Sequence, residues 1–201
     1  MTVRHRVLAD ADAVQARVAA MGNELAARHP DGCVLVGVLK GSVIVLADLV
    51  RAMCVSTRVD FVAVSSYRPG AGRVRLLKDL DLDVTGAPVV LVQDVVHTGL
   101  TAAFLTRELA RRGASSVEVC ALVDRRARRI VPVEVRTAGF VVDDEYVIGM
   151  GLDRLGLYRN LRSLVAVDEA ALAADPDALV GDLYRDRARG VGGGRGSRQR
   201  R

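Results

Sequence analysis

The feature that most constrains the fold is a set of short apolar runs that alternate with segments of helical periodicity. The runs are CVLVGVL (33–39), PVVLVQ (88–93) and SSVEVCALV (115–123). The intervening segments with apolar residues at helical spacing are 10–28, 42–53 and 99–112. Runs that are apolar on both faces are typical of strands covered by helices on both sides. The alternation therefore predicts an α/β fold with a mainly parallel sheet flanked by helices.

The remaining elements are less regular. A strand is expected at 56–67, followed by a Pro- and Gly-rich loop at 68–74 and a short returning strand within 73–81. Two extended segments, 136–142 and 145–152, are separated by a turn at Asp143-Asp144. The C-terminal part predicts a last strand within 163–169 and a helical segment at 168–184 that breaks at Pro176.

Length and composition indicate one globular domain with a real core, because half of the 201 residues are hydrophobic. No apolar run approaches the ~20 residues of a membrane span. The N-terminus lacks the apolar stretch of a signal peptide, so we expect a cytoplasmic location. The cysteines, Cys33, Cys54 and Cys120, form no CxxC pair and predict reduced thiols rather than a zinc site or a disulfide framework.

The positive charge is concentrated at the C-terminus. The chain carries a formal charge of +5, and residues 185–201 hold seven arginines and one aspartate, which is +6. Residues 1–184 therefore sum to −1 and are expected to form the folded domain. The Gly- and Arg-rich residues 185–201 are expected to be a disordered, solvated tail, and no specific nucleic-acid partner is expected.

In a parallel sheet, ligands bind beyond the carboxyl ends of the strands. Three strand ends carry polar residues: Lys40-Gly41-Ser42, the segment 94–101, and Asp124-Arg125. Lys40 is notable because only two of the 29 basic residues are lysines. A lysine kept in such a chain suggests a need for a compact ammonium that arginine cannot replace.

The segment QDVVHTGLT (93–101) links a buried strand to the start of a helix. Exposed N–H groups at that helix start favour an anion, glycine allows close backbone approach, and threonine hydroxyls add donors. The segment is neither a Walker loop nor a G-x-G-x-x-G loop. It predicts a phosphate pocket, with an ordinary threonine-capped turn as the alternative.

The segment resembles the phosphoribosyl-diphosphate (PRPP) motif of type I phosphoribosyltransferases, which is an apolar run, two acids, two apolar residues and Asp-Thr-Gly-x-Thr. Four further stretches are similar to the hypoxanthine-guanine phosphoribosyltransferase family in order and spacing. They are VGVLKGSVIVLADLVR, VDFVAVSSY, VRLLKDLDLDVTG and DEYVIGMGLDRLGLYRNL. The resemblance covers about residues 10–168. It implies the type I phosphoribosyltransferase fold, with a small hood region and a mobile flap.

The resemblance also implies roles for individual residues. The family transfers ribose 5-phosphate from PRPP to a purine nitrogen and releases pyrophosphate, with Mg²⁺ as cofactor. Residues implied to bind the phosphoribosyl and pyrophosphate groups are Leu39, Gly41, Ser66, Tyr67, Gln93, Asp94, Thr98, Gly99, Leu100 and Thr101. Ser66 and Tyr67 open the flap, which extends to about Arg75. Lys40 and Arg159 are implied to act on the pyrophosphate, and Asp153 and Asp94 to bind the metal.

Base recognition is implied for three residues. Tyr146 matches the aromatic residue that stacks on the purine, and Val147 offers backbone contacts to the ring edge. Arg125 stands where the family has a lysine that donates to the oxygen at purine position 6, and its larger, planar group would reshape the pocket. Arg129 is expected near the phosphate.

Two positions depart from the family. Gln93 replaces the first acid of the pair, so it can bond the ribose hydroxyls but carries no charge for a metal. His97 replaces the aspartate that is assigned as base for the purine N7 proton. A neutral imidazole could take that proton near pH 7, whereas a bound 5′-phosphate would favour the imidazolium, which cannot.

Three hypotheses follow, in order of preference. The first is a working purine phosphoribosyltransferase of purine salvage, with His97 as the base. The second is a specialised transferase for a non-standard base such as a 7-deazapurine, which has no N7 proton to lose. The third is a non-catalytic nucleotide-binding regulator. By analogy with the family we expect PRPP and a purine-like base as ligands, and a homodimer or homotetramer with no membrane partner.

Overall fold

The computed structural model describes residues 3–65 and 75–184 and contains a six-stranded sheet in the order β4-β3-β2-β5-β6-β7. These strands are β2 (Cys33–Val38), β3 (Thr57–Val64), β4 (Leu76–Lys78), β5 (Pro88–Val96), β6 (Ser116–Arg125) and β7 (Val135–Val142). All pair in parallel except β4, which is antiparallel to β3. Every residue of β2 is buried, as expected for a central strand covered on both faces.

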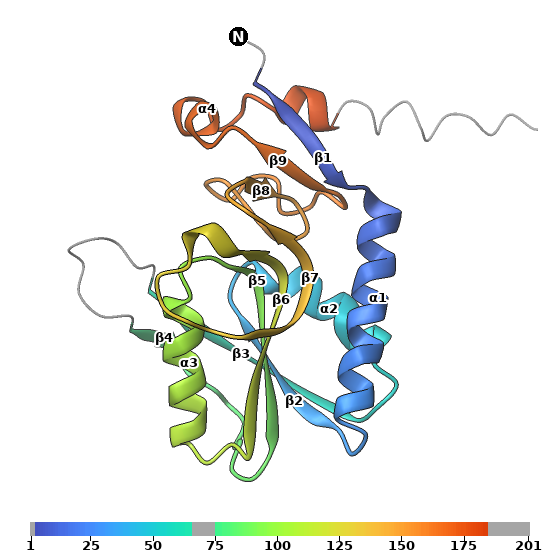
Figure 1. Ribbon diagram of the computed structural model, residues 1–201, viewed down its shortest axis with the longest axis vertical. Helices are drawn as coiled ribbons and strands as arrows, with labels where there is room; N and C mark the ends of the chain where they lie inside the picture. Colours follow the sequence, from blue (N-terminus) through green and yellow to red (C-terminus); the bar gives the residue numbers. More distant parts are fainter. Residues whose placement is uncertain (1–2, 66–74, 185–201) are drawn as a thin grey trace, which may run out of the picture.

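Helices cover both faces of this sheet (Figure 1). α1 (Ala11–Arg28) and α2 (Ser42–Ala52) supply apolar side chains to the core on one face, and α3 (Leu100–Arg111) supplies them on the other. The first of these helices begins where the sequence predicts, because the Asp10 carboxylate caps it by accepting from the Ala13 N–H at 2.9 Å.

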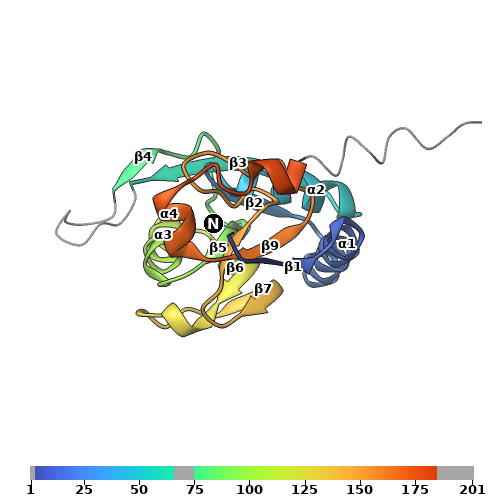
Figure 2. The ribbon, with the colours of Figure 1, turned by 90° about the horizontal axis from the view of Figure 1, so that it is seen from above.

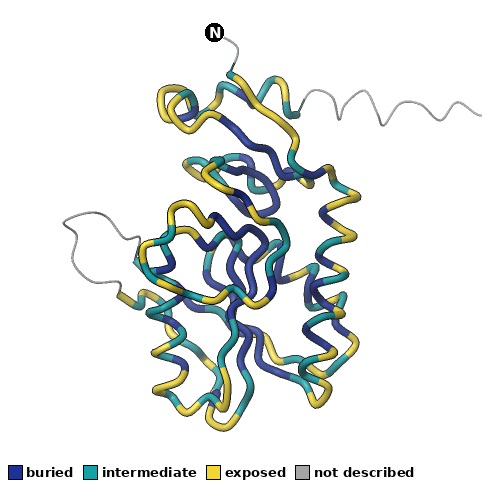
Figure 3. Tube along the Cα trace, in the orientation of Figure 1, coloured by how far each residue is buried: buried dark blue, intermediate teal, exposed yellow. Residues whose placement is uncertain are grey.

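A second, smaller sheet forms the hood. It is antiparallel, in the order β1-β9-β8, and consists of β1 (His5–Ala9), β8 (Tyr146–Ile148) and β9 (Leu164–Val167). α4 (Glu169–Ala174) and the helical residues 180–184 pack on it with their own apolar cluster. Figures 1 and 2 show this sheet stacked over one end of the main sheet. Figure 3 shows that the central strands of the main sheet are buried, while the helices and β1 keep exposed faces.

The predicted elements agree with the structure within a few residues, with one topological difference. A turn does follow β7 at residues 143–144, but β7 pairs with β6 in the main sheet, whereas β8 pairs with β9 in the hood. The two extended segments therefore do not form a hairpin, and the chain between them crosses from one sheet to the other. β5 also continues to Val96, three residues beyond the predicted strand, and a 3-10 turn, η1 (Arg126–Arg128), follows β6.

Two expectations fall outside the described residues. The first is the flap, which includes Ser66, Tyr67 and the loop 68–74. The second is the tail of residues 185–201. Within the described ranges, no helix combines the length and apolar character that a membrane span needs.

Candidate active site

The loop from β5 to α3 has the geometry of an anion cradle. Gly99 precedes α3 with a φ of +83°, and a Cβ there would lie 2.5 Å from the Val131 carbonyl oxygen, so only glycine fits. The Thr98 carbonyl accepts from the Ile130 and Val131 N–H groups at 2.9 and 3.0 Å, which fixes the loop against residues 130–131. The N-terminus of α3 thus faces a cavity of about 460 Å³, into which an anion would fit.

Residues predicted to bind the phosphoribosyl group line this cavity. They include Gln93, Thr98, Gly99 and Thr101, together with His97. Gln93 is only 5% exposed, and its Oε1 has no hydrogen-bond partner among the described residues. A buried, unpaired acceptor is costly unless a ligand supplies a donor, and a ribose hydroxyl is such a donor.

The loop after β2 packs directly on the half-buried carboxylate of Asp94. The Leu39-Lys40 peptide is cis, and a Cβ on Gly41 would lie 1.5 Å from Asp94 Oδ2. The Gly41 carbonyl oxygen in turn contacts Gly151, where a Cβ would lie 2.0 Å away. Three chain segments that are distant in sequence therefore meet at Gly41, and the exposed Lys40 precedes it in the chain.

Asp153 and Arg159, both predicted for the pyrophosphate side, are bonded to each other. Arg159 Nη2 lies 2.7 Å from Asp153 Oδ1, and its Nη1 donates to the Gly151 carbonyl at 2.6 Å. Burial raises the pKa of Asp94 to about 6; the nearby Arg159 opposes this rise and Asp153 adds to it. The three side chains thus form one electrostatic unit.

The same carboxylates are the donors that could hold a divalent metal. Among the described residues no cluster of three or more His, Cys, Asp or Glu side chains could hold one unaided. Asp94 and Asp153 provide hard oxygen donors, which suits Mg²⁺ when phosphate oxygens and water complete its coordination. This donor set therefore fits a metal that arrives with a phosphorylated substrate.

A second cavity, of about 250 Å³, lies where the hood meets the end of β5. Its lining residues are Asp94, Val95, His97, Val123, Arg125, Glu145, Tyr146, Val147, Leu152, Asp153 and Glu169. All three predicted base-binding residues, Arg125, Tyr146 and Val147, are thus brought together with His97. The Tyr146 hydroxyl donates to the Asp153 carbonyl at 2.9 Å, which links the predicted stacking ring to the metal-side loop.

His97 lines both cavities and stands between them. Partial burial lowers the pKa of His97, and the positive charges of Arg125 and Arg128 lower it further. Both effects favour the neutral imidazole, the state that can accept a proton.

Arg125 is almost fully buried, with 7% of its side chain exposed. Its Nη2 donates to the Asp144 carbonyl and, at 2.9 Å, to Asp144 Oδ1, while its Nε has no hydrogen-bond partner in the described chain. Arg129, expected near the phosphate, does lie beside Gly99, but its guanidinium is bonded to Asp124 and to the Val133 carbonyl.

Sequence reasoning missed several lining residues, notably Glu145, Leu152 and Glu169. Glu145 and Leu152 lie within the stretch DEYVIGMGLDRLGLYRNL, which implies no role for them, and Glu169 follows the last strand without a motif of its own. Only the crossing of the chain from β7 to β8, and the return through β9, places them over the end of the main sheet.

Comparison with known proteins identifies the family. Residues 10–154 match the model of the phosphoribosyl transferase domain. Hypoxanthine-guanine phosphoribosyltransferase of Mycobacterium avium is 39% identical over 172 residues, covering 81% of this chain and 85% of that protein. Hypoxanthine phosphoribosyltransferase of Escherichia coli K12 is 40% identical over 154 residues, covering 74% and 86%.

Structural comparison agrees. A crystal structure of a hypoxanthine phosphoribosyltransferase from Staphylococcus aureus matches with a TM-score of 0.79 at 30% identity, covering 85% of this chain and 94% of that one. The resemblance seen in the sequence and the expected fold are both confirmed. The chain therefore belongs to the phosphoribosyltransferase family, in its hypoxanthine-guanine branch.

Proposed function

We propose that the protein transfers the 5-phosphoribosyl group of PRPP to a purine base, giving the nucleoside 5′-monophosphate and pyrophosphate. The observation that carries this proposal is the junction of the two cavities at His97: an anion cradle on one side and a slot for a planar base on the other. The curated relatives are themselves named as hypoxanthine-guanine and hypoxanthine phosphoribosyltransferases. Family membership makes the chain a pentosyltransferase.

In this proposal each part of PRPP has its own residues. The 5′-phosphate occupies the N-terminus of α3 at Thr98–Thr101, and the ribose hydroxyls bond Gln93 and Asp94. The pyrophosphate lies between the loop 39–41 and Arg159, where the Lys40 ammonium neutralises its charge as the C1′–O bond breaks. Burial of Asp94 and proximity of Gly41 support a site that is closed on this side.

Mg²⁺ is proposed as the cofactor. Asp94 and Asp153 would hold it together with pyrophosphate oxygens, and when bound it neutralises the charge of the leaving group. Gln93 adds no charge on the ribose side, so the metal there depends on Asp94.

His97 is proposed as the base. The purine N9 attacks C1′ while the N7 proton passes to the imidazole, which must be neutral beforehand. The lowered pKa of His97 in the free protein supports this state. A bound 5′-phosphate would raise the pKa of His97, because its negative charge stabilises the imidazolium that forms in the reaction.

The two other hypotheses receive less support. Relatives at about 40% identity are named for hypoxanthine and guanine, not for 7-deazapurines. A regulator without chemistry would have no use for the residues of the pyrophosphate side, yet Lys40, Asp153 and Arg159 all remain beside Asp94.

Assembly and location are also proposals. A Trypanosoma cruzi relative, 31% identical with a TM-score of 0.79, has been studied for the role of its C-terminal region in oligomeric state and activity. We propose a homo-oligomer, a dimer or tetramer, with a cytoplasmic location.

Pyrophosphate release tests the function. The purified protein is incubated with PRPP, Mg²⁺ and, separately, hypoxanthine, guanine and a 7-deazapurine. Turnover of hypoxanthine or guanine is expected. Turnover of the deazapurine alone would favour the specialised transferase, and binding of PRPP without turnover of any base would favour the regulator.

A further inference from the structure

The base cavity contains one carboxylate that accepts no hydrogen bond in the described chain and has no role in the proposed reaction. Four acidic residues line it: Asp94, Glu145, Asp153 and Glu169. Asp94 accepts from the Val95 N–H at 2.9 Å, and Asp153 holds Arg159 and the Gly156 N–H. Both carboxylates already have a role on the ribose and metal side of the proposed site.

The other two carboxylates, Glu145 and Glu169, differ in how many hydrogen bonds they accept. Both carboxylate oxygens of Glu145 accept bonds, one from Arg6 Nη2 at 3.3 Å and one from the Asp143 N–H at 3.1 Å. Glu169 accepts no hydrogen bond within the described ranges, and its sole ion pair there places Oε2 3.8 Å from Arg125 Nη2. That distance is too long for a hydrogen bond, so the lone pairs of Glu169 are free for a ligand.

An unpaired donor lies beside this unpaired acceptor. Arg125 is almost fully buried, and its Nε–H lacks a partner, while its Nη2 is held by Asp144. A buried guanidinium N–H without an acceptor is costly, so its retention in a cavity wall points to a ligand that supplies one. The cavity thus presents a donor and an acceptor side by side to whatever base enters.

We infer that Glu169, which lies beside the Arg125 that the family resemblance places at O6, accepts from the N1–H of a 6-oxopurine and selects guanine. This inference rests on the proposed function. The O6 oxygen accepts from Arg125, and N1–H donates to one Glu169 oxygen. The second oxygen of the carboxylate then faces purine position 2, where guanine has an amino donor and hypoxanthine has none.

The same arrangement disfavours two other purines. Xanthine places a carbonyl oxygen at position 2, which the carboxylate repels. Adenine has a donor at position 6 and an acceptor at N1, the reverse of what Arg125 and Glu169 offer. Unpaired buried groups discriminate between bases more strongly than shape does.

His97, Arg125 and Glu169 all line the base cavity. The position of Glu169 has a local cause, since Asp168 caps α4 and fixes its first residue, Glu169, at the end of β9.

The test compares bases in Glu169 variants. Glu169→Gln keeps an acceptor for N1–H but places an amide donor opposite position 2, which matches xanthine. Because half of the Glu169 side chain is exposed, we expect a moderate change: the ratio of kcat/KM for xanthine to that for guanine rises about tenfold. Glu169→Ala lowers the ratio of guanine to hypoxanthine by a similar factor.

Glu145→Ala is the matched control, because Glu145 lines the same cavity with both oxygens engaged; its base ratios should change less than twofold. Affinities for GMP, IMP and XMP, measured by calorimetry, give the same ratios without turnover. Equal changes for all bases in both Glu169 variants would overturn the inference and leave the proposed function intact. Absence of turnover with any purine in the wild-type protein would instead overturn the proposed function.

Discussion

At the level of single residues, the acid–base character of the site comes from two groups whose pKa values move in opposite directions. Burial raises the pKa of Asp94 to about 6, whereas partial burial and two arginines lower that of His97. Both shifts favour the neutral form, because a charge loses hydration at the meeting point of the two sheets. Each shift leads to a separate measurement.

His97 should titrate below its ordinary value of 6.5 in the free protein. The sequence contains three histidines, and the imidazole signal that is missing from the proton NMR spectrum of His97→Gln belongs to His97. As pH falls through that pKa the base is lost and kcat/KM declines. Removing a general base typically costs 10²–10⁴-fold in rate, which we expect for His97→Gln. Retention of full activity in that variant would exclude His97 as the base.

Asp94 should lower the stability of the ligand-free protein at neutral pH. Its ordinary pKa is 3.8, so the folded state binds the proton more tightly than the unfolded chain. The free energy of unfolding therefore falls as pH rises from about 4 to about 6, by roughly 1–3 kcal/mol. Asp94→Asn should melt at a higher temperature than wild type at pH 7.5 and at the same temperature near pH 4, while losing activity. A lower melting temperature at pH 7.5 would contradict this account.

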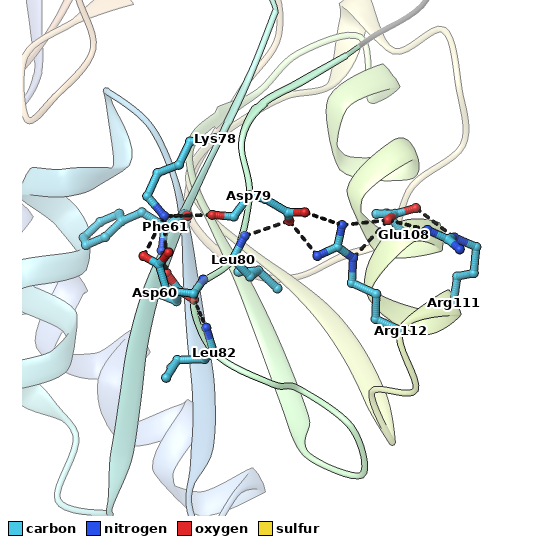
Figure 4. Close-up of polar contacts among 10 residues, drawn as sticks. Asp60, Phe61, Lys78, Asp79, Leu80, Leu82, Glu108, Arg111 and Arg112 are labelled. Atoms are coloured by element: carbon cyan, nitrogen blue, oxygen red, sulfur yellow. Dashed lines mark hydrogen bonds and ion pairs between the residues drawn. The ribbon is translucent and has the colours of Figure 1, made fainter.

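At the level of elements, the two lysines differ in their contacts: one holds strands and loops together, and the other is exposed at the site. Lys78, at the end of β4, donates to the Phe61 and Asp79 carbonyls and to Asp81 Oδ2, at 3.1, 2.8 and 3.0 Å. Figure 4 shows these contacts continuing through Asp79 to Arg112, so β3 and the segment after β4 are tied to the end of α3. Lys40 is exposed and makes no such bond within the described residues.

Exchanging each lysine for arginine should separate the structural role of Lys78 from the role of Lys40 in turnover. A planar guanidinium cannot direct three donors from one nitrogen, so Lys78→Arg should lower the melting temperature and leave kcat close to wild type. Lys40→Arg should leave the melting temperature unchanged and lower kcat. The readouts are thermal melts and pyrophosphate release. Equal melting temperatures for wild type and Lys78→Arg would show that the ammonium geometry is not required.

How far the sequence predicts these elements depends on how local their causes are. Apolar runs, the Asp10 cap and the glycine-containing loop at 97–99 are local patterns, and the main sheet, its helices and the anion cradle follow from them. The partners of β7 and β8 are not local, since both segments are short and apolar. Glu169 therefore falls where the expected last strand and the expected helix overlap, without a predicted role in the site, and the bond between Arg159 and Asp153 has no signal in the sequence.

At the level of the whole molecule, the site exists because the hood is seated on the main sheet. The two parts meet at backbone: the carbonyl oxygen of Gly41, after β2, lies against Gly151, between β8 and β9. Side chains of both sheets line the base cavity. A small displacement of the hood would thus open the base cavity and separate Asp153 from Asp94 together.

Two glycines of the hood test this dependence. Gly151 and Gly156 both have positive φ, +101° and +89°, so alanine at either position carries a backbone cost of about 1–2 kcal/mol. They differ in surroundings: a Cβ on Gly151 would lie 2.0 Å from the Gly41 carbonyl oxygen, whereas one on Gly156 meets nothing within 4 Å. The Gly156 N–H that holds Asp153 is also kept in alanine.

The free energy of unfolding of Gly156→Ala should therefore fall by that backbone cost alone, and the variant should keep most of its activity. Gly151→Ala should lose more stability, because the β-carbon displaces either the hood or the loop 39–41. Its kcat/KM for PRPP should fall at least tenfold at temperatures where the protein is still folded, since both the Lys40 loop and the Asp153 loop meet at this contact. Denaturant unfolding and steady-state kinetics measure the two effects. Equal losses in the two variants would mean that the hood and the main sheet do not depend on this contact for the geometry of the site.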